Sequence, residues 1–171
     1  MTGAVIDDSP RRFPSRVERA IERWHSAAVA RSSGRVLDLS IPFDRLVLVG
    51  ALGIEVEPSW DVIISAGELA RFPDLGLAFR AIDRLLVPTG RLDAFEPVAR
   101  PGTLRMFAAA PFTRTPWLRG MHVGRDLLAA MRTTALVGDD VERVTMRTLI
   151  VPLRHFVSLS ARRAIPSSEA D

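Results

Sequence analysis

The segment Trp60–Phe95 reads WDVIISAGELARFPDLGLAFRAIDRLLVPTGRLDAF, and it decides the fold. Its first six residues form a short apolar run, which is typical of a buried strand. Apolar positions at helical spacing then predict an amphipathic helix over 74–87. A Pro-Thr-Gly turn precedes a further apolar run, which predicts a strand over 91–95. Strand, helix and strand in this order are the repeating unit of a parallel α/β sheet.

The flanking sequence extends this unit at both ends. A helix is expected over 16–30, where Ser15 and Glu18 fit a capping box, and a short buried strand over 36–39. The later elements expected are a helix over 125–136 and strand-like runs over 141–148 and 155–161. We therefore predict an α/β fold with a mostly parallel sheet and a C-terminal antiparallel hairpin. One domain is expected over 13–163, between flexible tails at 1–12 and 164–171.

Composition narrows the classes of function. The 171 residues include no cysteine, which excludes disulfides, thiolate metal sites and cysteine nucleophiles. The formal net charge is only +3, with acids interspersed among the basic residues, so nucleic-acid binding is not expected. We find neither a run long enough for a membrane span nor a signal peptide, and we expect a cytoplasmic protein. The three histidines lack metal-ligand spacing, and no metal is expected.

The order of motifs resembles that of class I S-adenosylmethionine-dependent methyltransferases, especially the ubiquinone/menaquinone type and related small-molecule enzymes. The similar pieces are Trp60-Asp61-Val62, Phe72-Pro73-Asp74, the turn Leu86–Leu92 and the acid Glu96 at a strand end. GRVLDL at 34–39 looks like the family's first strand, and the resemblance covers residues 14–163. It implies a Rossmann-like fold and S-adenosylmethionine as cofactor.

The resemblance fails on the cofactor side. In the family, an acid after the first strand is followed by a G-x-G-x-G loop, and Asp38 matches the acid. The glycine positions correspond here to Ser40, Pro42 and Asp44. Side chains at these positions would fill the space of the cofactor's methionine and ribose portions. Pro42 also lacks a backbone donor, and Asp44 would bring a negative charge near the ligand's carboxylate.

A second departure concerns chain length. The family's first and fourth strands are separated by a helix, two strands and another helix, whereas only about 20 residues lie between Leu39 and Trp60. One crossover fits that gap. The run Leu48–Ala51 is read as an echo of the family's third strand, which makes Ala51 the adenine-side position. The candidate cofactor-binding residues are therefore Asp38, Ser40, Ala51 and Ser65. The short gap predicts a shortened version of the family's fold.

Two residues are candidates for catalysis. His122, in the loop Gly120–Gly124, is the best general base, because the family's corresponding loop lies near the substrate pocket; a structural or merely exposed histidine is the alternative. Glu68 follows the WDVIIS strand, where the family lines its cofactor and substrate site. Glu96 is expected either to contact a substrate or to be an ordinary strand end.

Residues 104–118, LRMFAAAPFTRTPWL, carry more large apolar side chains than is usual for a solvent-exposed loop without a function. Phe107, Phe112 and Trp117 are the candidate surface for a substrate or a partner. A lid over a hydrophobic ligand, a membrane-surface contact, a partner interface and packing on the protein's own core all stay open.

The sequence favours a degenerate, non-catalytic methyltransferase-like protein that acts through association with itself or with another protein. A shortened sheet leaves an unpaired edge, and unpaired edges favour pairing with another chain. The alternatives are an active S-adenosylmethionine-dependent methyltransferase with a small apolar acceptor, and a module that binds a hydrophobic ligand.

Overall fold

A computed structural model describes residues 13–52, 54–98, 121–122, 125–148 and 153–164. A five-stranded sheet in the order β1-β2-β3-β5-β4 forms its centre. The strands are β1 (Val36–Asp38), β2 (Trp60–Ala66), β3 (Leu86–Pro97), β4 (Leu136–Thr145) and β5 (His155–Arg163). The helices are α1 (Ser15–Arg31), α2 (Pro42–Gly50), α3 (Leu75–Leu85) and α5 (Leu127–Met131), with a 3-10 turn, η1 (Leu69–Arg71).

The sheet is mixed, and the expectation of a mostly parallel sheet is wrong. β2 pairs in parallel with β1 and with β3, whereas β5 pairs antiparallel with β3 and β4. The C-terminal antiparallel hairpin is confirmed. With the pairing of β3 and β5, it makes two of the four strand pairings antiparallel.

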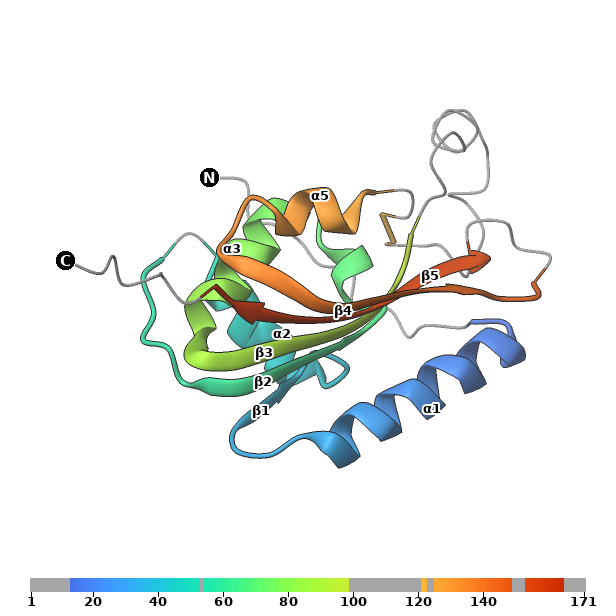
Figure 1. Cartoon of the computed structure of the whole chain (residues 1–171), viewed down its shortest axis with the longest axis horizontal. Coiled ribbons are helices and arrows are strands. Elements are labelled where there is room, and N and C mark those ends of the chain that lie inside the picture. The colour runs from blue at the N-terminus through green and yellow to red at the C-terminus, as the bar shows by residue number, and fades with distance from the viewer. Residues whose placement is uncertain (1–12, 53, 99–120, 123–124, 149–152, 165–171) are drawn as a thin grey trace.

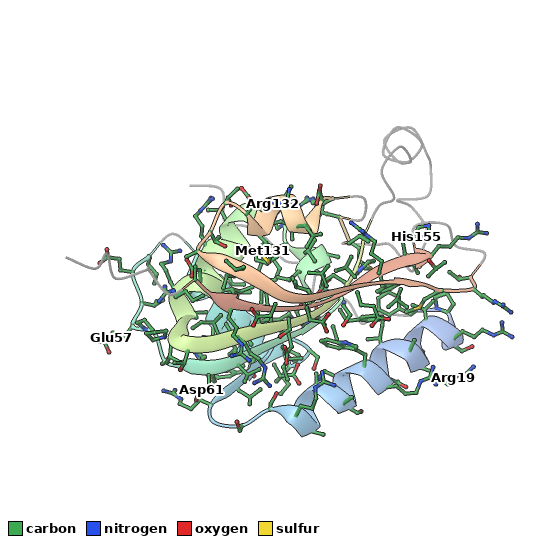
Figure 2. The ribbon with its side chains drawn as sticks, viewed as in Figure 1. Arg19, Glu57, Asp61, Met131, Arg132 and His155 are labelled. Atoms are coloured by element: carbon green, nitrogen blue, oxygen red, sulfur yellow. The ribbon has the colours of Figure 1, made fainter. Side chains whose placement is uncertain are left out.

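Helices cover both faces of the sheet. α1 lies along one face, and α3 and α5 lie on the other (Figure 1). Trp24 anchors α1, because its ring stacks on Phe95 and its Nε1 donates to Ser158 Oγ at 3.0 Å. In Figure 2, Arg19 lies on the side of α1 away from the sheet, and Met131 points from α5 toward it.

The helix boundaries differ from expectation where capping decides them. α1 begins at Ser15 with Pro14 as its N-cap, and no side chain caps it, so the expected capping box is wrong. Asp74 caps α3 by accepting from Leu77 N at 3.0 Å. Asp126 caps the short α5, which ends at Met131 because Leu136 already belongs to β4.

The third strand is longer than predicted. β3 begins at Leu86, and residues 88–90, expected as a turn, fall within it. The register between β2 and β3 shifts between Trp60 and Val62, which accommodates the extra residues. Gly90 lies there with no room for a side chain, since a Cβ would come within 2.9 Å of the Trp60 carbonyl oxygen.

A single helix connects β1 to β2, as the short gap predicted. The element is α2, and it includes Leu48, Val49 and Gly50, so the expected strand echo at 48–51 is wrong. Pro42 stands in the first turn of α2, where the missing N–H is not needed. No further strand lies between β1 and β2 in the described residues 39–52 and 54–59.

β1 is an edge strand, but most of its outer backbone is already bonded. Asp38 N donates to Asp44 Oδ2 at 2.9 Å, and the Asp38 carbonyl oxygen accepts from Ile41 N at 2.9 Å. Within this strand of three residues, Val36 alone is left for pairing with another chain. A short edge closed in this way limits edge-to-edge association.

Candidate functional site

The candidate site lies where β1 and β2 end. These strands are parallel, so their carboxyl ends meet at one edge of the sheet, which is where open α/β folds bind ligands. A cavity of about 200 Å³ lies between this edge and α1. It is lined by Phe13, Glu18, Ile21, Glu22, His25, Ser40, Ala66 and Glu68. The structure therefore brings the predicted Ser40 and Glu68 to one cavity.

The cavity is small for a nucleoside cofactor. Pockets for drug-sized ligands occupy about 300–1,000 Å³. The floor includes the buried side chains of Phe13, Ile21 and Ala66, while Glu18 and Glu22 on α1 are exposed at it. A cavity of this size is somewhat larger than one that holds benzene, and it is smaller than a nucleoside joined to an amino acid needs.

Asp38, the predicted cofactor acid, is already bonded within the protein. Its Oδ2 lies 2.6 Å from His25 Nε2, and its Oδ1 accepts from Ser40 N at 3.0 Å. Ser40 Oγ lies 3.4 Å from the same His25 nitrogen. Because both contacts use Nε2, His25 does not relay between the serine and the acid as in a catalytic triad.

The segment after β1 folds back on itself. Asp44, at a position where the family has glycine, accepts from the backbone N–H of Asp38. The N–H of Ile41 is bonded to the Asp38 carbonyl oxygen, and Pro42 has none. Donors that a glycine-rich loop turns toward its ligand are therefore used internally or missing.

Glu68 is a structural ion-pair centre. Its Oε2 lies 2.8 Å from Arg45 Nη1 and 3.1 Å from Arg71 Nε, and all three residues are buried, with Glu68 only 2% exposed. The carboxylate therefore holds α2 and η1 to the end of β2. The prediction that Glu68 lies at the site is compatible with this position, but its partners are the protein's own guanidinium groups.

Ser65 and Glu96 form a second buried group at this edge. Ser65 Oγ donates to Glu96 Oε1, which also accepts from Leu69 N at 3.1 Å. Glu96 Oε2 accepts from Ala70 N at 3.2 Å. Glu96 is therefore neither an exposed strand end nor a free ligand-binding acid, because it fixes the start of η1.

His122 lies beside η1, and its backbone N–H donates to the Ala70 carbonyl oxygen at 2.6 Å. The residue is exposed, and it does not line the cavity. Partial burial of the ring lowers the pKa of His122, and the charge of Arg125 lowers it further. The imidazole is therefore neutral near pH 7, which is compatible with a base.

Stability is expected to depend on the protonation of His122. Its pKa in the folded protein lies below the ordinary value of 6.5, so near and below pH 6.5 the unfolded chain binds more protons. The stability contributed by neutral His122 is full above pH 6.5 and is lost as the pH falls.

Urea unfolding of the wild type and His122→Gln from pH 8 to pH 5 measures this. Acidification should destabilise the wild type more than the variant, by a small margin because the ring is exposed. A stability difference between the wild type and the variant that stays constant with pH, or that favours the wild type at low pH, would contradict the lowered pKa of His122.

Ala51, predicted on the adenine side, lies away from the cavity. Ala51 follows α2 and is buried in the core, with its carbonyl oxygen accepting from Arg84 Nη2 at 3.0 Å. It does not line the cavity. Phe107, Phe112 and Trp117 lie outside the described residues, so their expected role as a surface for substrate or partner stays a prediction.

Sequence reasoning missed His25 and Arg45. His25 projects from α1, and its Nε2 reaches Asp38 at the end of β1. Arg45 lies on a mostly apolar helix and is buried, and a buried arginine requires a partner. Its partner, Glu68, is 23 residues away in sequence, and no local pattern links the two.

No group of three acidic or histidine side chains in the described part of the chain could hold a metal ion. Among the same residues, no helix is long and apolar enough to cross a membrane.

The fold has relatives among solved structures. The [4+2]-cyclase SpnF superposes with a TM-score of 0.58 and 15% identity, over 95% of this chain and 86% of that chain. The 1,6-didemethyltoxoflavin-N1-methyltransferase of Burkholderia thailandensis, solved with S-adenosylhomocysteine, gives a TM-score of 0.53 and 16% identity over 87% and 79%. A structure concerning conversion of a disulfide bond into a thioacetal group in echinomycin biosynthesis gives 0.50 and 17% over 96% and 86%.

No protein-family model matches the sequence, and no curated protein matches it significantly. At these identities the similarities show the fold alone, which is that of class I S-adenosylmethionine-dependent methyltransferases. Because a cyclase and a methyltransferase share this fold, it does not fix the reaction.

Proposed function

We propose that this chain is a non-catalytic protein with a methyltransferase fold that acts through association with another protein chain. The observation that carries the proposal is the internal bonding of the polar groups at the carboxyl edge of β1 and β2. Asp38 is held by His25 and Ser40, and Glu68 is held by two arginines. A ligand would have to share either carboxylate with these partners.

The family makes S-adenosylmethionine the cofactor to test, since the toxoflavin methyltransferase was solved with S-adenosylhomocysteine. The residues here do not fit that cofactor in the family's manner. The cavity of about 200 Å³ is too small, and Asp44 bonds the backbone where a glycine loop would open. The single helix between β1 and β2 also leaves no second-strand acid for the ribose hydroxyls.

The runner-up is an active methyltransferase acting on a small apolar acceptor, and a further alternative is a hydrophobic-ligand module. Binding of S-adenosylmethionine would distinguish the active methyltransferase from the non-catalytic protein proposed here. The apolar floor of the cavity is the feature that favours a ligand module. Its two exposed glutamates and its small volume disfavour a long apolar ligand.

Thermal unfolding with S-adenosylmethionine and S-adenosylhomocysteine tests the proposal. Binding to the folded state alone raises its stability by about 2.7 kcal/mol when the ligand is at about 100 times its Kd. We expect no change in Tm at millimolar ligand, beyond that produced by ATP as a nucleotide control. A saturable rise specific to the sulfonium cofactor or its product would support the active enzyme.

A further inference from the structure

The helix α2 carries an apolar stripe that faces solvent. Phe43, Leu46 and Gly50 lie on the exposed side of the helix at the spacing i, i+3 and i+7, and Val47 at i+4 borders them, half-buried against the core. Phe43 is 73% exposed and Leu46 is 64% exposed. Apolar side chains at this spacing ordinarily pack against a core, whereas Phe43 and Leu46 have no covering element among the described residues.

The other side of α2 packs inward, although it contains a charge. Leu48 is buried in the core, and Arg45 is buried on Glu68. The ion pair therefore fixes the rotation of α2, with the guanidinium inside and the phenylalanine outside. Turning the helix to bury Phe43 would separate Arg45 from Glu68, which is costly for a buried pair.

Exposed apolar side chains concentrate at this helix. Of the eight large apolar residues exposed in the described part of the chain, four lie between 41 and 54. Ile41 precedes α2 and is 47% exposed, and Ile54 follows it and is 54% exposed. The adjoining β1 edge offers little backbone for pairing, so side-chain contact is the means of association that this end of the sheet provides.

The area of this surface suits a dimer. The exposed side chains of Ile41, Phe43, Leu46 and Ile54 together leave about 400 Å² of apolar surface open on each copy. Since apolar atoms make up about 60% of an interface, two such surfaces correspond to a total of about 1,300 Å². Stable interfaces bury about 1,200–2,000 Å² in total.

We propose that the α2 stripe binds the same stripe on a second copy of this chain. In a two-fold interface, residue i meets residue j and j meets i, so the surface must complement itself. If two α2 helices cross antiparallel at Leu46, Phe43 of each copy lies over Gly50 of the other. A Cβ at Gly50 would meet no atom within 4 Å, so open space lies above it for a ring.

This inference rests on the proposed function, and it is tested separately from cofactor binding. Sedimentation equilibrium from low micromolar to high micromolar protein should show a monomer–dimer equilibrium. Phe43→Ser and Leu46→Ser should each raise the dimer Kd at least about 30-fold, because central apolar anchors dominate interfaces. Val137→Ser on β4, where the native side chain is also exposed, is the matched control and should leave Kd unchanged.

The variant Gly50→Leu distinguishes this specific interface from non-specific hydrophobic association. The substitution adds apolar surface and meets no clash within one copy, so non-specific association would tighten. The antiparallel pairing would lose the space for Phe43, and Kd should rise at least tenfold. A monomer at every concentration, or Gly50→Leu that associates as tightly as the wild type, overturns the inference. Cofactor binding by an intact dimer would overturn the proposed function and leave the interface standing.

Discussion

Glu68→Ala is expected to lower the free energy of unfolding by about 3–5 kcal/mol, which is the cost of breaking a buried ion pair by removing one partner. Arg45 and Arg71 would remain buried beside the space vacated by the carboxylate. The contact that holds α2 and η1 to the end of β2 would disappear. Denaturant unfolding followed by circular dichroism measures this loss.

Glu22→Ala is the matched control, because Glu22 lines the same cavity but is exposed on α1. It should change stability by less than about 0.5 kcal/mol. If Glu68→Ala were as stable as the wild type, Glu68 would be available for a ligand or for catalysis. The structural role given to it here would then be wrong.

Glu96→Ala is expected to cost about 3 kcal/mol, since two buried backbone donors and a hydroxyl would lose their acceptor. Leu69 N, Ala70 N and Ser65 Oγ all donate to this carboxylate. Glu96→Gln keeps one amide oxygen as an acceptor and should lose clearly less stability.

Thermal and urea unfolding of both variants, beside Glu142→Ala on the exposed side of β4, give the comparison. Equal stability of Glu96→Ala and the Glu142→Ala control would contradict the buried acceptor role. It would instead favour the sequence-based alternative in which Glu96 contacts a substrate.

Strong periodicity predicted the elements of the core. The burial of α3 at helical spacing and the apolar run of β2 are local properties, and both elements lie where the sequence indicated. One crossover was expected between β1 and β2, but residues 48–51 of it were predicted as a strand, because LVLVGA is apolar on every side and fits a strand equally well. The proline at 42 with Asp44 close behind is a helix-start signal that would have found α2.

The mixed sheet and the site were harder to predict because they depend on long-range pairing. The antiparallel insertion of β5 between β3 and β4 has no local signature. Ser65 lies near the end of a strand that the sequence predicts, and Glu68 follows that strand, so both lie at the carboxyl edge of the sheet. Their buried partners, Arg45 and Glu96, come from other elements, so the sequence alone could not distinguish a structural acid from a catalytic one.

An amide NMR titration of uniformly ¹⁵N-labelled protein with S-adenosylhomocysteine tests the central claim most directly, because it detects even millimolar binding and locates it. The account predicts no saturable shifts for the amides of Asp38, Ser40 and Asp44, whose segment is bonded to itself. Saturable shifts centred on these three amides would show that the segment opens for the cofactor. That result would contradict the non-catalytic assignment.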